Sequence, residues 1–165
     1  EAWNVLPGGE GYVQLADMPK ATDVTEAKAT IEQWQQFFEV KDVVNKALEE
    51  AKNNEAQPIK KSFEASVTLY APTEAQAALN ALSDHLEQLL IVSKFEMKDN
   101  SEVPADALTV NEFSVVVNPA PGHVCDRCRA VKEEVGTIEE APEMCTRCYH
   151  IVKENFPEYF EQTEA

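Results

Sequence analysis

Cys125-Asp-Arg-Cys128 and Cys145-Thr-Arg-Cys148 bound the stretch CDRCRAVKEEVGTIEEAPEMCTRC, residues 125–148, which decides the fold of the C-terminal third of the chain. Two residues separate the cysteines of each pair, and sixteen residues separate the pairs. A Cys-x-x-Cys turn aims both sulfurs at one point. Two such turns supply four thiolates for a closed tetrahedral site, with Zn–S distances of about 2.3 Å. The spacing therefore predicts one structural zinc ion bound by these four cysteines.

Other uses of four cysteines fit the pattern less well. A thioredoxin-like redox pair needs only one Cys-x-x-Cys motif, and iron–sulfur clusters usually have different spacings. Disulfides are typical of secreted proteins, but no basic and apolar leader opens this chain. No apolar run approaches the roughly 20 residues of a membrane span. We therefore expect reduced thiols and a cytoplasmic protein. His123 and His150 flank the ligands and are expected to face solvent.

Arg127 and Arg147 occupy the same place in the two cysteine turns. They have two interpretations: they donate to the sulfurs and offset the charge of a zinc–thiolate centre, or they contact phosphate. With Arg129 and Lys132 they form the set of candidate RNA contacts, which Lys153 extends. Several glutamates in the same stretch would weaken a basic surface: Glu133, Glu134, Glu139, Glu140 and Glu143.

Working outward from the cysteines, Pro119, Pro121 and Gly122 indicate a module boundary. Residues 121–165 are predicted to be a zinc-ribbon-like module with four cysteine ligands, a short helix over 149–154 and a frayed acidic tail.

The pattern of residues 26–120 predicts an α+β domain, which consists of a long amphipathic helix and a small sheet-and-helix layer. Its parts are a helix over 26–54 capped by Thr25, strands over 63–70, 91–97 and 112–118, a helix over 74–88, and a loop around Pro104. The helix over 26–54 has an apolar side: Ile31, Trp34, Phe37, Phe38, Val40, Val44, Ala47, Leu48 and Ala51.

The first 25 residues are rich in glycine and proline and predict an extended linker from a preceding body, with at most one strand over Tyr12–Leu15.

The formal net charge of −16 repels phosphate backbones and argues against a free-standing nucleic-acid binder, whether of DNA or RNA. Its simplest consequence is solubility. The chain has no phosphate-cradling glycine loop, no Gly-x-Ser-x-Gly elbow and no His-Glu-x-x-His motif. A closed site of four cysteines also lacks an open position for a substrate. By itself, the chain is expected to catalyse no reaction.

The stretch KDVVNKALEEAK at 41–52, followed by IKKSFEASVTLY at 59–70, resembles the C-terminal region of bacterial isoleucyl-tRNA synthetases. In that family a helix reading Arg-Asp-x-Val-x-Lys-Ala-Leu-Glu-x-Ala-Arg runs into Ile-Gly-x-Ser-Leu-Glu-Ala and a strand. LLIVSK at 89–94 resembles the next apolar segment of the family. EAWNVLP at 1–7 and VQLADMP at 13–19 resemble the link out of its anticodon-binding helices. The two Cys-x-Arg-Cys turns resemble its terminal zinc finger.

The resemblance implies a class I ligase that joins isoleucine to its tRNA with ATP, whose C-terminal region contacts tRNA-Ile and binds zinc through four cysteines. The motifs near His-Ile-Gly-His and Lys-Met-Ser-Lys-Ser are absent from this chain. The ATP, active and editing sites are therefore expected on N-terminal catalytic and anticodon-binding domains outside it.

The chain departs from the family pattern at a few positions. Arg129 stands in place of a tryptophan, Lys60 in place of a glycine, and Lys41 and Lys52 in place of arginines. Lysine lacks the planar fork of arginine, so these changes bear on RNA contacts and leave the metal ligands intact. Two alternatives remain open: a stand-alone acidic zinc-ribbon module that binds another protein, which the net charge favours, and a redox or electron-transfer protein.

Overall fold

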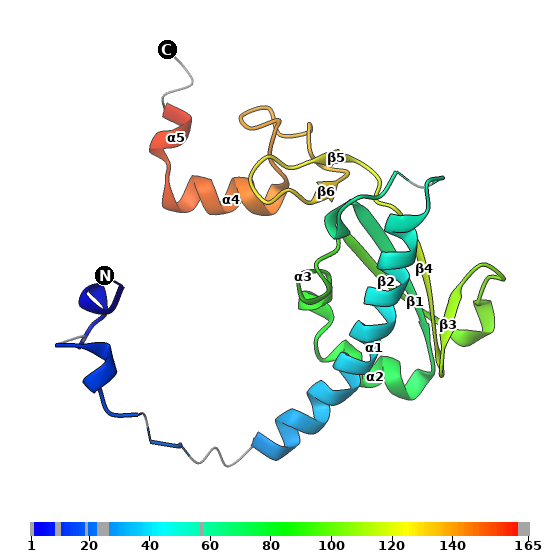
Figure 1. Ribbon diagram of the computed structural model, residues 1–165. Helices are drawn as coiled ribbons and strands as arrows, with labels where there is room; N and C mark the ends of the chain where they lie inside the picture. Colours follow the sequence, from blue (N-terminus) through cyan, green and yellow to red (C-terminus); the bar gives the residue numbers. More distant parts are fainter. Residues whose placement is uncertain (1, 9–10, 19, 23–26, 57, 162–165) are drawn as a thin grey trace. The chain divides into compact units, whose positions relative to one another are not determined.

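The computed structural model describes residues 2–8, 11–18, 20–22, 27–56 and 58–161 (Figure 1). The chain divides into two units, Glu1–Ile31 and Glu32–Ala165. The predicted domain divisions at residues 25 and 120 stay predictions.

The described part of the first unit contains two single 3-10 turns, Ala2–Val5 and Val13–Leu15. The strand considered for Tyr12–Leu15 is replaced by a turn, in which the Leu15 N–H donates to the Tyr12 carbonyl at 2.9 Å. Thr25, the predicted helix cap, lies outside the described residues.

Helix α1, Ala27–Asn53, matches the predicted helix over 26–54. Its buried face begins at Phe37 and continues at three- and four-residue steps as far as Ala51. Two residues predicted to face the core are instead exposed, Ile31 at 65% and Phe38 at 54%. The apolar stripe that packs on the sheet therefore starts later in the helix than the sequence suggests. The sequence puts both Phe37 and Phe38 on the apolar side of the helix, but only Phe37 is buried against the core.

The main sheet has four strands in the order β2-β1-β4-β3. Strand β1, Ala65–Ala71, runs parallel to β2, Lys94–Asp99, and antiparallel to β4, Phe113–Pro119. Strand β3, Leu108–Val110, pairs with β4 as a hairpin that the sequence did not predict. The parallel pair needs a crossover, which α2 and α3 provide.

The core forms where alternate residues of the two central strands meet the helices. Val67 pairs with Val117 and Leu69 with Val115, so these four side chains share one face of the sheet. All four are buried in one cluster with the inner face of α1. Figure 1 shows the cyan half of α1 lying along these strands. The α+β class predicted from the sequence is confirmed.

The prediction of a single helix over 74–88 is wrong. The structure has α2, Thr73–Asn80, a 3-10 turn at Ser83–His85, and α3, Leu86–Leu90. Leu82 leaves the helical region at φ −111° and ψ 6°, and the following serine and aspartate favour turns over helix interiors.

Ile91, predicted to open a strand, instead ends α3 in the left-handed region at φ 58°. There the Val92 N–H donates to the Glu87 carbonyl at 2.9 Å.

The cysteine region contains a small hairpin and a helix. Strands β5, His123–Val124, and β6, Val131–Lys132, pair antiparallel. Helix α4, Thr146–Asn155, is longer than the predicted helix over 149–154. A further turn of helix, α5, Glu158–Glu161, lies in the tail that was predicted to fray.

Candidate metal centre

The two cysteine turns bring their four sulfurs together. All four Sγ atoms lie within 4.8 Å of one another, and Cys128 Sγ is 3.9 Å from Cys145 Sγ. Tetrahedral coordination at about 2.3 Å places neighbouring sulfurs about 3.8 Å apart. Cys125, Cys145 and Cys148 are buried, and Cys128 is half-buried. The sulfurs therefore already stand close to the spacing that one tetrahedral ion requires.

The first cysteine turn is closed by backbone hydrogen bonds at the tip of the β5–β6 hairpin. The Arg129 N–H donates to the Cys125 carbonyl at 2.8 Å, and the Cys125 N–H donates to the Ala130 carbonyl at 2.8 Å. Arg129 has a φ of 66°, which turns the chain back toward β6. The turn thus fixes both sulfurs on one side of the hairpin.

The second cysteine turn is the beginning of α4. Cys145 is the N-cap residue, and Cys148 lies in the first helical turn. The unpaired N–H groups and the positive dipole end of a helix favour thiolates at these positions. The Cys145 N–H also donates to Cys125 Sγ at 3.3 Å, so the backbone of one turn contacts a sulfur of the other.

The protonation of the sulfurs is set by burial and by backbone donors. Burial raises the pKa of the Cys125 thiol, but N–H groups of Cys128, Cys145 and Arg127 outweigh it and lower the pKa to about 6. Burial raises the pKa of Cys145 to about 12 and also raises the pKa of Cys148. A divalent cation among the sulfurs favours the thiolate form of each.

The donor set fits a soft metal ion in a closed site. Four thiolates without carboxylate or water positions are typical of structural zinc, and no disulfide occupies these cysteines, which are free. Around them pack buried apolar side chains that limit the access of water: Val135, Ala141, Met144 and Val152.

Two of the predicted RNA contacts, Arg127 and Arg147, are directed at the sulfurs. Arg127 Nη1 donates to Cys148 Sγ at 3.6 Å. The side chain of Arg147 hydrogen-bonds the Cys128 sulfur, and this bond raises the pKa of its guanidinium. The geometry therefore favours the interpretation in which both arginines donate to sulfur.

The other two predicted RNA contacts have partners of their own. Arg129 Nη1 lies 3.3 Å from the Asp126 carboxylate, but 61% of its side chain stays exposed. Lys132 Nζ lies 2.6 Å from Glu87 Oε2 and 2.6 Å from the Ser93 carbonyl oxygen, with 27% of its side chain exposed. Arg127, Arg129 and Arg147 are all exposed residues, and of these three Arg129 is the one with no hydrogen bond to sulfur in the described structure.

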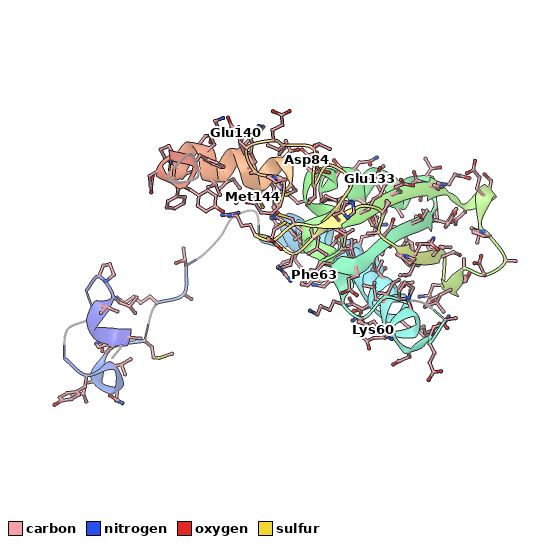
Figure 2. The ribbon with its side chains drawn as sticks, turned by 90° about the horizontal axis from the view of Figure 1, so that it is seen from above. Lys60, Phe63, Asp84, Glu133, Glu140 and Met144 are labelled. Atoms are coloured by element: carbon pink, nitrogen blue, oxygen red, sulfur yellow. The ribbon has the colours of Figure 1, made fainter. Side chains whose placement is uncertain are left out.

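Three lysines outside the four predicted contacts differ in their surroundings. Lys153 is bound to Glu140 at 2.7 Å and to the Tyr149 hydroxyl, which ties the preceding loop to α4. Lys60 and Lys61 are exposed and begin the segment that leads into β1. Figure 2 shows Lys60 well apart from Glu140 and Met144.

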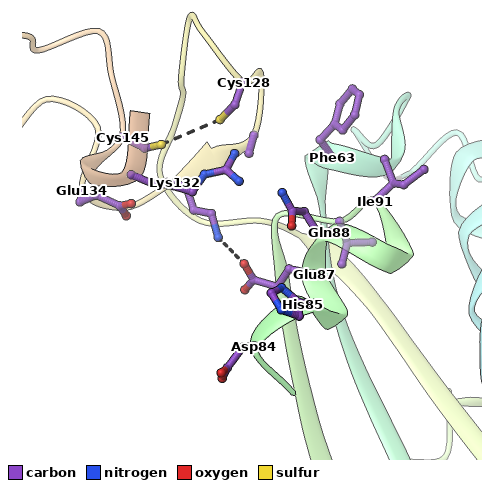
Figure 3. Close-up of a pocket in the computed structure, with 13 residues that line it drawn as sticks. Phe63, Asp84, His85, Glu87, Gln88, Ile91, Cys128, Lys132, Glu134 and Cys145 are labelled. Atoms are coloured by element: carbon purple, nitrogen blue, oxygen red, sulfur yellow. Dashed lines mark hydrogen bonds and ion pairs between the residues drawn. The ribbon is translucent and has the colours of Figure 1, made fainter. Parts of the chain in front are cut away.

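The cysteine module contacts the sheet through a docking seam, which no sequence motif predicts. Its residues are Phe63, Glu87 and Ser93 on one side and Val131 and Lys132 on the other. Ser93 Oγ donates to the Phe63 carbonyl and accepts from the Val131 N–H at 2.7 Å. Figure 3 shows Lys132 reaching from the module to Glu87. A single serine and a glutamate have no characteristic spacing, so only the fold reveals their role.

A cleft of about 510 Å³ opens beside the docking seam, between α3 and the cysteine module. Phe63 and Ile91 line the cleft, together with Cys128 and Arg147 of the module. Figure 3 shows Phe63 and Ile91 across the cleft from Cys128.

Comparisons with known proteins identify relatives over nearly the whole chain. The chain is 44% identical over 158 residues to the isoleucine–tRNA ligase of Lactobacillus acidophilus, covering 96% of this chain and 17% of that protein. It is 40% identical over 158 residues to that of Enterococcus faecalis, again covering 96% and 17%. It is 42% identical over 158 residues to that of Bacillus cereus, covering 94% and 17%. No protein-family model matches the chain.

The resemblance drawn from the sequence is thus confirmed, and the chain spans about 17% of the length of the curated relatives it matches. In the described residues, no helix has the length and apolar character to cross a membrane.

Proposed function

We propose that the chain is the C-terminal, zinc-binding and tRNA-contacting region of an isoleucine–tRNA ligase, which attaches isoleucine to tRNA-Ile with ATP in the cytoplasm. The observation that carries the proposal is the 40–44% identity to such ligases over nearly the whole chain. The cysteine cluster adds a site of the expected chemistry. Catalytic and editing sites are assigned to domains outside this chain.

The metal has a structural role in this proposal. A bound Zn²⁺ would link the β5–β6 hairpin to the first turn of α4 through Cys125, Cys128, Cys145 and Cys148. Among the described residues, the buried cluster at this site has only seven members, three of them cysteines, which is too small a core to hold the module by itself. Cysteines would take all four coordination positions of the ion, so the site would position surface residues and would not activate a substrate.

The tRNA contact is assigned to the rim of the module. Arg129 is the main candidate because its guanidinium is exposed and its ion-pair partner, Asp126, is exposed as well. An exposed pair of this kind contributes little energy, so a phosphate can replace the carboxylate. Lys132, Arg127 and Arg147 would act mainly by holding the rim in place. The net charge of −16 makes tRNA binding by the chain alone weak, so the rest of the ligase must supply most of the affinity.

Two experiments test the proposal. The genomic reading frame upstream of Glu1 should encode the class I motifs, and a short frame without them would contradict it. In a chimera, this chain replaces the matching segment of the Lactobacillus acidophilus ligase. Arg129→Ala should then weaken tRNA binding severalfold and reduce its salt dependence by about one ion, as expected for a lost phosphate contact.

The matched control is Lys153→Ala, which removes an exposed cation of the same module that is already paired with Glu140. Equal tRNA affinity and salt dependence in the Arg129→Ala and Lys153→Ala chimeras would refute the assigned contact. Charging activity that survives removal of residues 121–165 would refute the role of the module.

A further inference from the structure

The two cysteine turns share a crossed arrangement of arginine and sulfur. Arg127 precedes Cys128 in the first turn, and Arg147 precedes Cys148 in the second. Each guanidinium bonds to a cysteine of the other turn. Arg127 donates to Cys148, and Arg147 is bonded to Cys128, so each arginine reaches the last sulfur of the opposite turn.

The charge of the metal centre explains what these two arginine–sulfur bonds achieve. Four thiolates and one Zn²⁺ carry a formal charge of −2, and the two guanidinium groups bring the local sum to zero. The chain as a whole carries −16, so no general positive field is available to offset the centre. Charge-assisted N–H donors also fix the direction of the sulfur lone pairs.

The two sulfurs that the arginines contact differ in their exposure to solvent. Cys148 is fully buried, whereas Cys128 is half-buried and lines the cleft beside α3. Arg147 lines the same cleft as Cys128. Arg127 lines a different groove of the module, together with Met144 and Val152.

We propose that Arg127 and Arg147 are reciprocal positioning residues, each holding the terminal sulfur ligand of the opposite cysteine turn and together neutralising the metal–thiolate centre. The inference rests on the metal site of the proposed function and is independent of tRNA. It assigns these two arginines a role in metal affinity and thiolate reactivity that does not depend on phosphate contact.

The test uses the full chain, loaded with Co²⁺ or Zn²⁺, and needs no RNA. Loss of partners that orient metal ligands typically costs about 10–100-fold in metal affinity, so Arg127→Ala and Arg147→Ala should each weaken Zn²⁺ binding by about that factor in a chelator competition. Lysine at either position should restore less than the full affinity, because an ammonium lacks the planar fork. Arg129→Ala is the matched control, since this third arginine is paired with Asp126 and has no bond to sulfur in the described structure.

Absorption of the Co²⁺ form supplies a second measurement that general unfolding would not imitate. Removing an N–H donor makes the thiolate a stronger electron donor, so the sulfur-to-cobalt charge-transfer band should move to lower energy while the tetrahedral d–d bands remain. The Arg129→Ala band should stay in place. Unchanged bands and affinities in the Arg127→Ala and Arg147→Ala chains, or a chain that binds neither metal, would overturn the inference. The tRNA assay on the chimera decides the proposed function separately.

Discussion

Ser93 has no exposed surface, and its hydroxyl lies between the segment leading into β1 and strand β6 of the cysteine module. It donates to the Phe63 carbonyl and accepts from the Val131 N–H. Its own carbonyl accepts from Lys132. One small residue thus satisfies a buried N–H of the module and a partly buried carbonyl on the other side of the docking seam, which makes the contact specific as well as close.

Ser93→Ala should reduce the free energy of unfolding by about 2 kcal/mol, because it leaves the buried Val131 N–H without its acceptor and the partly buried Phe63 carbonyl without its donor. Urea unfolding of the metal-bound chain measures the change. Ser83→Ala is the control, since its hydroxyl is exposed and bonds to the neighbouring Asp84, and it should change stability by less than about 0.5 kcal/mol. Similar losses in both variants would contradict the role of Ser93 in the docking seam.

Gly122 permits a close backbone approach at the start of the module. Its φ is 110°, and a Cβ there would lie 2.3 Å from the Lys132 carbonyl oxygen. Gly136 has a φ of 98° but would place its Cβ in open space. Gly136→Ala should therefore cost only backbone strain, about 1–3 kcal/mol, while Gly122→Ala should cost clearly more and separate β5 from β6. Thermal unfolding of both variants tests the difference, and equal midpoints would exclude the steric contact.

At the scale of elements, α1 shows how packing selects among apolar residues that share one helical pattern. Phe37, Val44 and Leu48 have at most 2% of their surface exposed, whereas Ile31 and Phe38 remain mostly in solvent. The amphipathic period identified the helix, but only its meeting with β1 and β4 decides where the buried stripe begins.

Leu48→Ala should lower the free energy of unfolding by about 2–5 kcal/mol, since it opens a cavity in the core between α1 and the sheet. Ile31→Ala, on the same helix, should change it by less than about 0.5 kcal/mol, because that side chain is 65% exposed. Denaturant unfolding at a fixed metal concentration compares the two. A comparable loss for Ile31→Ala would show that its side chain is packed in solution.

At the scale of the molecule, the described part of the second unit contains two separate hydrophobic clusters. The larger one joins α1, α2 and α3 to the four-stranded sheet. The smaller one surrounds the cysteines, and its other buried members are Val135, Ala141, Met144 and Val152. The larger cluster holds twenty buried residues and does not involve the sulfurs, so the two clusters should respond differently to loss of metal.

Metal removal should therefore unfold the module and leave the sheet intact. After chelation under reducing conditions, the amides of Asp126, Arg129 and Cys145, which are held by bonds around the cysteine turns, should lose their protection from hydrogen exchange. The amides of Val67 and Leu69 in the central strand should keep theirs. Simultaneous loss at both places would show one cooperative unit, and unchanged protection would refute a structural metal.

The sequence by itself determined the features that depend on local spacing: the cysteine turns, the long helix α1, the alternating strands β1 and β4, and the resemblance to isoleucine–tRNA ligases. These follow from periodicity and from ligand geometry, which neighbouring residues encode. The break between α2 and α3 follows from the turn-favouring Ser83 and Asp84, a local signal that the apolar periodicity did not include. The left-handed Ile91, the exposure of Phe38 and the role of Ser93 were decided by tertiary structure. Each depends on which distant surface meets the element, and the crossed bonds of Arg127 and Arg147 arise only when two turns far apart in the chain face one another.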